Sequence, residues 1–398
     1  MTFTFPVSSR FGTEPADPVG DLFSVLSRGD IISFAGGIPD GALFDVENIT
    51  ESFEHVLATQ ARRALQYGAT PGEPELRAAA AGILARHLPT SPEDVLVTSG
   101  SQEGIYLAAQ ALVSPGDVVL VEEPTYLAAV QAFTLNGARL VGVEADAEGM
   151  LPDALASAIA EHGPRFVYLI PTFANPSGKT MGRRRREAVA EVLLRTGIAL
   201  VEDDPYGQLR FSGEAVPPIA ALPGMARQTI LLNSLSKVMA PGLRIGWMRV
   251  EGALKKIFGI AKSAVTLQSP ALNQLAAADY LTRHDLDAHI ARVVGPYRER
   301  RDAMHAGLLA MLPATATVTR PDGGMFCWVT LGDDTDTAQL LPVAVAEGVA
   351  FVPGWSFYAS DPDRSTMRIS YATNSPETIR EGLARLSFAL GAVASTTH

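Results

Sequence analysis

The stretch VLVTSGSQEGIYLAAQALVSPGDVVLVEEPTY, residues 95–126, decides the fold class. Two short runs rich in valine and leucine, residues 95–98 and 118–122, flank a helix-like segment over residues 105–113. A strand, a helix and a second strand in this order are typical of a parallel sheet, because two parallel strands need a crossover connection between them. The stretch therefore predicts an α/β protein.

The same alternation continues to about residue 250 and predicts a mostly parallel seven-stranded sheet. Several of these strands end in polar or glycine-rich sequence, and ligands of such sheets gather beyond the carboxyl ends of the strands. We expect an N-terminal arm over residues 1–44 that packs with the small domain, a large domain over 45–295 and a smaller α+β domain over 296–398. The remaining strand candidates are residues 140–143, 166–170, 198–201, 229–232 and 245–250.

Composition argues against several classes of protein. A net charge of -11 disfavours nucleic acid as a partner, and we expect the four arginines at 183–186 to be the solvated start of a helix. We find no signal-peptide pattern and no apolar run of membrane-spanning length, so we expect no membrane partner and a cytoplasmic location. The single cysteine, Cys327, excludes intrachain disulfides, and its apolar neighbours predict an inert core thiol. The histidines form no cluster with metal-ligand spacing, so we expect no metal.

Lys237 ends the run NSLSK, residues 233–237, which precedes PGLRIG, residues 241–246. A lysine drawn from water into an apolar setting has a lowered pKa, which makes its amine a better nucleophile and Schiff-base former. The alternative is a lysine whose stem packs while its head reaches solvent. Three other lysines fall in a helix-like polar pattern, and we expect them to be solvated: Lys255, Lys256 and Lys262.

Two loops after predicted strands could contact a ligand. Small residues around Ser101 at a helix start leave backbone N–H groups free to hold a phosphate, although simple N-capping by Ser99 or Ser101 is an alternative. The run NPSGKT, residues 175–180, is not a P-loop, because Phe173 stands where that motif requires glycine. We interpret this run as a turn in which Asn175 either donates a hydrogen bond into a site or has only a structural role.

The fifth strand runs into EDDPY, residues 202–206. Asp203 could pair with a cationic ring nitrogen, and Tyr206 could donate to an oxygen on the same ring. Together with a lysine, these are the groups that a pyridoxal phosphate site needs; exposed acids or a metal site are the alternatives. Arg368, inside a strand-like apolar alternation, suits a bidentate carboxylate, unless it lies on an edge strand in solvent.

Taken together, nine motifs resemble the fold-type I pyridoxal phosphate enzymes, specifically the class I/II aminotransferases and their 2-aminoadipate and kynurenine aminotransferase branch. The resemblance covers nearly the whole chain. The motifs are SFAGGIPD (33–40), LQYGATPGEPELR (65–77), TSGSQEG (98–104), EEPTY (122–126), NPSGKTM (175–181), EDDPYGQLRF (202–211), NSLSK with PGLRIGW (233–247), PDGGMFCW (321–328) and MRISYA (367–372).

The resemblance implies that Lys237, Asp203 and Tyr206 are the catalytic residues and that pyridoxal 5'-phosphate is the cofactor. Lys237 would form the Schiff base and later move a proton between substrate and cofactor. Asp203 would hold the pyridinium nitrogen. Tyr206 and Asn175 would contact the ring hydroxyl, and Tyr126 would stack on the ring. Contacts to the phosphate would come from Ser101, Gln102, Ser234, Ser236 and Arg244.

The resemblance also implies the substrates and the assembly. Arg368, with Asn175 and the backbone at Gly37, would bind the α-carboxylate of an L-α-amino acid, whose amino group passes to 2-oxoglutarate or pyruvate by a ping-pong mechanism. The sites would lie between two subunits of a homodimer, and Tyr67 would reach the partner's site. The alternative is another reaction on the same fold, such as that of a decarboxylase, a lyase or a biosynthetic cyclase or oxidase.

One departure from the family pattern concerns the amino donor. In the aminoadipate branch an arginine of the arm can bind the distal carboxylate of the substrate, and this chain has Gly20 at the matching position. Losing the cation that pairs with a buried carboxylate typically costs a few kcal/mol. We therefore expect a broad or non-acidic amino donor, with Arg28 or Arg10 as possible substitutes. A regulator with a fused DNA-binding domain is not expected, because residues 1–32 are too few for that domain.

Overall fold

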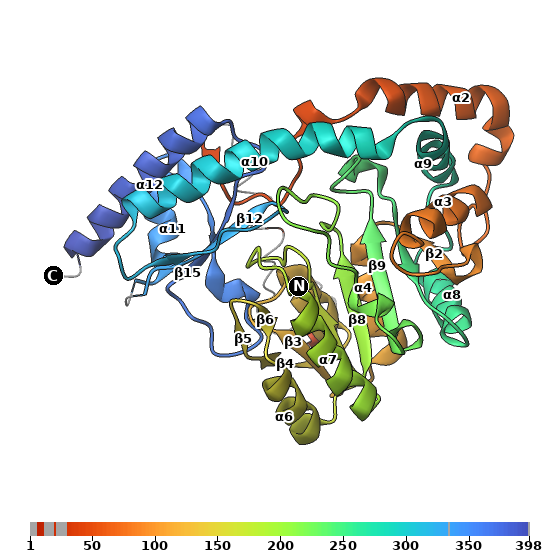
Figure 1. Ribbon diagram of the computed structural model, residues 1–398, viewed down its shortest axis with the longest axis horizontal. Helices are drawn as coiled ribbons and strands as arrows, with labels where there is room; N and C mark the ends of the chain where they lie inside the picture. Colours follow the sequence, from red (N-terminus) through yellow and green to blue (C-terminus); the bar gives the residue numbers. More distant parts are fainter. Residues whose placement is uncertain (1–5, 12–19, 21–29, 333–334, 397–398) are drawn as a thin grey trace, which may run out of the picture.

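The computed structural model describes residues 6–11, 20, 30–332 and 335–396. Its large part is built on a seven-stranded sheet in the order β2-β10-β9-β8-β7-β3-β4, whose colours in Figure 1 run from orange in β2 to green in β8 and β9. All seven predicted strands are present, and the predicted α/β fold is confirmed. The strands are β2 (Val95–Thr98), β3 (Val118–Glu122), β4 (Arg139–Val143), β7 (Phe166–Leu169), β8 (Ala199–Asp204), β9 (Thr229–Ser234) and β10 (Gly246–Arg249).

Only β10 runs against the other strands. It pairs in antiparallel register with β2 and with β9, whereas β9, β8, β7, β3 and β4 pair in parallel. No crossover helix separates β9 from β10; the intervening chain forms a turn with one short 3₁₀ helix, Pro241–Leu243. The chain thus returns directly alongside β9, and this return places the turn with Lys237 and Arg244 at the carboxyl end of β9.

Helices cover both faces of this sheet. Alternate residues of β3 show the two faces, because Val119 and Val121 pack in one apolar cluster and Val118 and Leu120 in the other. The first cluster includes α4 (Ser101–Leu112) and α5 (Leu127–Leu135), and the second includes α6 (Pro152–His162) and α7 (Arg183–Thr196). The sheet is therefore buried on both sides, so a ligand has access mainly at the strand ends.

The remaining elements of the large part are a short strand pair and four helices. A short antiparallel pair, β5 (Ala145–Asp146) and β6 (Gly149–Met150), follows β4. Four helices, seen in orange and teal in Figure 1, complete this part: α2 (Val46–Ala64), α3 (Pro74–Leu84), α8 (Leu254–Val265) and α9 (Ala271–Arg283).

The C-terminal part is a smaller α+β unit reached through α10 (Leu286–Met311), the long helix across the top of Figure 1. Its sheet has the order β11-β12-β15-β14. Near the start of the chain, β1 (Ile32–Ser33) pairs with β13 (Val349–Ala350). Helix α10 crosses the boundary that we place at residue 295, and that boundary stays a prediction. The other elements are β11 (Thr317–Val318), β12 (Phe326–Thr330), α11 (Thr337–Ala346), β14 (Val352–Pro353), β15 (Thr366–Ser370) and α12 (Pro376–Thr396).

Two expectations about solvated cations were wrong. Arg186 is only 1% exposed, and its guanidinium donates to the carbonyls of Pro171 and Met181. Lys262 is also buried, beside Glu103. The expectation for Cys327 is confirmed, since the thiol is buried and burial raises its pKa to about 12. None of the described helices is both long enough and apolar enough to cross a membrane.

Candidate active site

A cavity of about 580 Å³ lies at the carboxyl ends of the central strands. Its volume falls within the range of about 300–1,000 Å³ that is usual for small-molecule sites. Of the thirteen residues that the sequence predicts for the site, twelve line this cavity and Tyr67 does not. The twelve are Gly37, Ser101, Gln102, Tyr126, Asn175, Asp203, Tyr206, Ser234, Ser236, Lys237, Arg244 and Arg368.

Lys237 follows β9 directly and is half-buried, with its amine in the cavity. Its Nζ donates a 2.8 Å hydrogen bond to the carbonyl oxygen of Gly37. Burial, with a smaller effect of the nearby cations Arg368 and Arg244, lowers the pKa of Lys237 to about 8, although the charge of Asp203 acts in the opposite direction. The amine therefore has the neutral fraction that a nucleophile or a base needs.

Asp203 lies on β8, and the alternation along this strand separates it from its acidic neighbours. Glu202 points the other way and accepts hydrogen bonds from the backbone N–H groups of Ile219 and Ala220. Asp203 is 2% exposed, and burial raises its pKa to about 7. Its Oδ1 is buried without a hydrogen-bond partner among the described residues. A ring N–H in the cavity would satisfy this oxygen and lower the pKa again.

A residue that sequence reasoning missed holds the other oxygen of Asp203. Tyr168 on β7 donates a 2.9 Å hydrogen bond to Oδ2. In the sheet register Tyr168 lies opposite Val201, so Asp203 is two residues further along β8 on the same face. The only signal in the sequence was a tyrosine within an otherwise apolar strand.

Arg368 is buried between Asn175 and the N-terminal segment. Its Nη1 donates to Oδ1 of Asn175 at 2.8 Å, and its Nη2 donates to the carbonyl of Ala35 at 2.8 Å. The guanidinium also lies over the ring of Phe326, at 4.3 Å from the centroid. Because β15 is paired on both sides, the edge-strand interpretation is excluded. No carboxylate of the described residues forms an ion pair with Arg368, and burial lowers its pKa to about 10.

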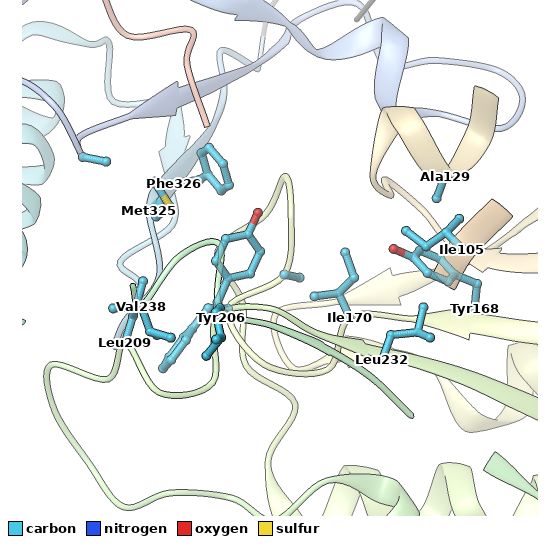
Figure 2. Close-up of a cluster of buried hydrophobic side chains, with 14 of the residues drawn as sticks. Ile105, Ala129, Tyr168, Ile170, Tyr206, Leu209, Leu232, Val238, Met325 and Phe326 are labelled. Atoms are coloured by element: carbon cyan, nitrogen blue, oxygen red, sulfur yellow. The ribbon is translucent and has the colours of Figure 1, made fainter. Parts of the chain in front are cut away.

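Tyr206 lies close to Asn175 and Phe326. Its hydroxyl accepts a 3.4 Å hydrogen bond from Nδ2 of Asn175. Figure 2 shows its ring beside Phe326, and the two centroids are 6.0 Å apart in an edge-to-face arrangement. Burial raises the pKa of Tyr206 above its ordinary value, so this hydroxyl keeps its proton at neutral pH and remains a donor.

The five residues predicted for a phosphate come together at the start of α4. Gly100 has a φ of 84° and lies against Arg244, whose Nη2 would be 2.8 Å from an added Cβ. The Oγ of Ser101 is buried without a hydrogen-bond partner among the described residues. Ser234 and Ser236 are joined by a 2.8 Å hydrogen bond between their hydroxyls. This set of donors suits an anion such as a phosphate.

The last two predicted residues differ in position. Tyr126, at the start of α5, lines the cavity, and burial raises its pKa to about 12. Tyr67 is 78% exposed and lies outside the lining. The described chain therefore offers Tyr67 to solvent or to a second molecule, and its predicted role stays a prediction.

The fold and the chemistry of the cavity define a pyridoxal phosphate-dependent enzyme of fold type I. The buried acceptor oxygen of Asp203 fits the ring nitrogen of this cofactor, and the amine of Lys237, with its lowered pKa, fits the aldehyde. The donors at the start of α4 fit the phosphate. Residues 29–386 match the family model described as aminotransferase class I and II, and the chain belongs to that family. It is an aminotransferase that uses pyridoxal 5'-phosphate.

Relatives and solved structures agree with this class. An aromatic-amino-acid aminotransferase from Thermococcus litoralis is 41% identical over 94% of this chain and 91% of its own length. The structure of an α-aminoadipate aminotransferase from Thermus thermophilus, complexed with N-(5'-phosphopyridoxyl)-L-leucine, has a TM-score of 0.92, 35% identity and 98% coverage of both chains. A Pyrococcus horikoshii kynurenine aminotransferase, in complex with PMP, has a TM-score of 0.92 and 37% identity over 97% of this chain and 96% of its own. The predicted resemblance is confirmed.

Proposed function

We propose that this aminotransferase takes the amino group of an L-α-amino acid with a non-acidic side chain, or of a broad set of amino acids, and passes it to 2-oxoglutarate or pyruvate. The main support is the shared cavity of Lys237, Asp203 and Arg368. Lys237 can exchange a proton, Asp203 can hold a cationic ring, and Arg368 can bind a carboxylate. The two substrates would use this single cavity in turn, which gives ping-pong kinetics.

When bound, pyridoxal phosphate supplies an aldehyde that takes the amino group and a ring that accepts the electrons of the broken Cα–H bond. Oδ1 of Asp203 would accept the ring N–H and keep that nitrogen protonated. Tyr206 and Asn175 would hold the ring oxygen, and Tyr126 would cover the ring face. Five residues would hold the phosphate: Ser101, Gln102, Ser234, Ser236 and Arg244.

Lys237 would act twice on protons. Its amine would first attach the cofactor. After the substrate has released the amine, it would take the proton from the substrate α-carbon and pass it to the cofactor carbon that carried the aldehyde. The lowered pKa of Lys237, about 8, makes the amine available for this work. The free amine donates to the carbonyl of Gly37, which places Nζ at the cavity wall.

Arg368 would bind the substrate α-carboxylate, which satisfies its buried charge. Asn175 orients the guanidinium by accepting from Nη1, and Nε, which is buried without a hydrogen-bond partner in the described part of the chain, is free for a carboxylate oxygen. A bidentate contact of this kind would hold the substrate α-carbon within reach of Lys237.

The lining supports a non-acidic donor. Its cations are Lys237, Arg244 and Arg368, and each already has a task in the proposal. Apolar side chains, Ile38 and Leu127 among them, line the same cavity. Of the possible substitute cations, Arg10 lies in an exposed 3₁₀ turn, and Arg28 lies outside the described residues.

We also propose that the protein is a homodimer in which Tyr67 reaches the partner's site. We further propose that it is located in the cytoplasm. A tyrosine ring that is 78% exposed is available for such a contact. Mixing two inactive variants, Tyr67→Ala and Lys237→Ala, tests the shared site, because hybrid dimers would contain one intact site. Activity that does not return on mixing and exchange would argue against it.

Two measurements test the proposed reaction. The visible spectrum of the loaded protein should change when an amino acid alone is added, and pyridoxamine phosphate should be recovered afterwards, since transamination must leave it. Steady-state rates across a panel of amino donors should favour non-acidic side chains or vary little. Aminoadipate and glutamate far ahead of all other donors would overturn the substrate proposal.

A further inference from the structure

A buried ion pair lies directly behind the start of α4, outside the cavity. Lys262 on α8 has a fully buried side chain, 0% exposed, and the side chain of Glu103 on α4 is 7% exposed. Nζ of Lys262 lies 3.0 Å from Oε2 and 3.2 Å from Oε1 of Glu103, and it donates to Oγ of Ser269 at 3.0 Å. A lysine and a glutamate are rarely buried to this degree unless they are paired.

Glu103 holds the loop that precedes its own helix. Its Oε2 accepts a 2.5 Å hydrogen bond from the backbone N–H of Ser99. Thr266 donates to Oε1 at 2.7 Å. Burial opposes ionisation of Glu103, but the hydrogen bond from Thr266 and the charge of Lys262 outweigh it and lower the pKa of Glu103. The group is therefore a carboxylate at neutral pH.

The loop is held from the cavity side as well. Nη2 of Arg244 donates to the carbonyl of Ser99 at 2.7 Å, and the hydroxyls of Ser99 and Ser269 are 3.3 Å apart. Ser99 is thus fixed at its N–H, its carbonyl and its side chain. The next residues, Gly100 and Ser101, present the proposed phosphate-binding edge of the cavity.

The charge of Glu103 creates a difficulty at this position. A carboxylate in the first turn of a helix occupies the same positive end that would attract the cofactor phosphate. Within a partly buried region, two anions near each other repel more strongly than in water. Lys262 is the cation paired with this carboxylate, and unlike Arg244 it does not line the cavity.

We propose that Lys262 and Glu103 are a positioning pair for the cofactor phosphate, in which Glu103 shapes the Ser99–Ser101 loop and Lys262 prevents the Glu103 carboxylate from repelling the phosphate. The inference rests on the phosphate site of the proposed function. It assigns a task to a lysine that contacts neither substrate nor cofactor.

The test compares the affinity of the full-length, cofactor-depleted protein for pyridoxal phosphate and for pyridoxal, which lacks the phosphate. Lys262→Met should weaken the binding of pyridoxal phosphate by about tenfold or more, because it leaves a buried charge unpaired beside the phosphate. The same substitution should change the binding of pyridoxal much less. Glu103→Gln, whose amide oxygen can still accept from Ser99, should change the ratio of the two affinities by less than about threefold. The double variant should recover the ratio of Glu103→Gln.

A purely structural role gives a different pattern. If Lys262→Met weakens both ligands equally, or if the double variant is no better than Lys262→Met, the inference is wrong. Should Lys262→Met fail to fold, Lys262→Gln, which keeps a buried donor, takes its place with the same two outcomes. Arg244→Met separates this inference from the proposed function. If Arg244→Met leaves the ratio of the affinities for pyridoxal phosphate and pyridoxal unchanged, the phosphate site itself is refuted. If Arg244→Met lowers that ratio but Lys262→Met does not, only the role of the pair is refuted.

Discussion

The phenol of Tyr168 donates a 2.9 Å hydrogen bond to Oδ2 of Asp203, while Oδ1 of the same carboxylate is buried without a partner among the described residues. One oxygen is therefore fixed, and the other faces the cavity. Figure 2 shows Tyr168 and Tyr206 among the buried side chains near Ile170. This arrangement orients the carboxylate before any ligand arrives, so that little has to reorganise when a cationic ring binds.

Removing the Tyr168 hydroxyl tests that relationship. Tyr168→Phe keeps the edge-to-face packing against Phe133, whose centroid is 5.4 Å away, but it leaves Oδ2 without its donor. A hydrogen bond to a charged group contributes about 1.5–3 kcal/mol, so we expect kcat/KM to fall by about tenfold or more. The pH midpoint of the cofactor's absorption change should also shift. Wild-type kinetics and an unchanged midpoint would show that the hydroxyl does not tune Asp203.

Substrate binding depends on Arg368. In Arg368→Met the α-carboxylate loses its buried cation, which typically costs 2–5 kcal/mol, or roughly 30-fold or more in kcat/KM for amino acids. A simple amine without a carboxylate is the matched control, and its slow reaction with the loaded protein should be similar in both proteins. An equal loss for amine and amino acid would mean that the substitution damages the fold and not the carboxylate site.

The lowered pKa of Lys237 has a consequence for stability. Burial lowers this pKa from 10.5 to about 8. Between these two values the unfolded chain holds a proton that the folded chain has lost, so the free energy of unfolding rises with pH in this window. Below about pH 8 both states are protonated and the contribution is level.

Urea unfolding of cofactor-depleted wild type and of Lys237→Met, across this pH range, isolates the lysine. The difference in unfolding free energy, wild type minus variant, should be flat below about pH 8 and should increase toward 10.5. A difference that does not change with pH would show that the folded chain leaves the pKa of Lys237 at its ordinary value.

Much of the fold and the site could be predicted from sequence because strand ends carry clear signals. An apolar run followed by polar residues located Ser101, Asp203 and Lys237, and the rule that parallel strands end at one edge brought them together. The antiparallel direction of β10 was not predicted, since apolar periodicity is the same for both directions.

Long-range partners were the part that sequence could not supply. Lys262 has the pattern of a solvated helix face, and its partner Glu103 lies 159 residues away. Arg186 belongs to a run of four arginines, yet it is buried against carbonyl groups. Tyr168 meets Asp203 only through the register of two strands. In each case the partner, not the local sequence, determines burial and charge.

Chemical reduction of the loaded protein identifies the lysine that carries the cofactor. The loaded protein is reduced with borohydride, which fixes the bond between cofactor and lysine, and is then digested and analysed by mass spectrometry. We expect the phosphopyridoxyl mass on the peptide containing Lys237 and on no other lysine. A label on Lys255, Lys256 or Lys262 would contradict this assignment. So would the absence of a label on Lys237 in protein that was reduced while fully loaded with cofactor.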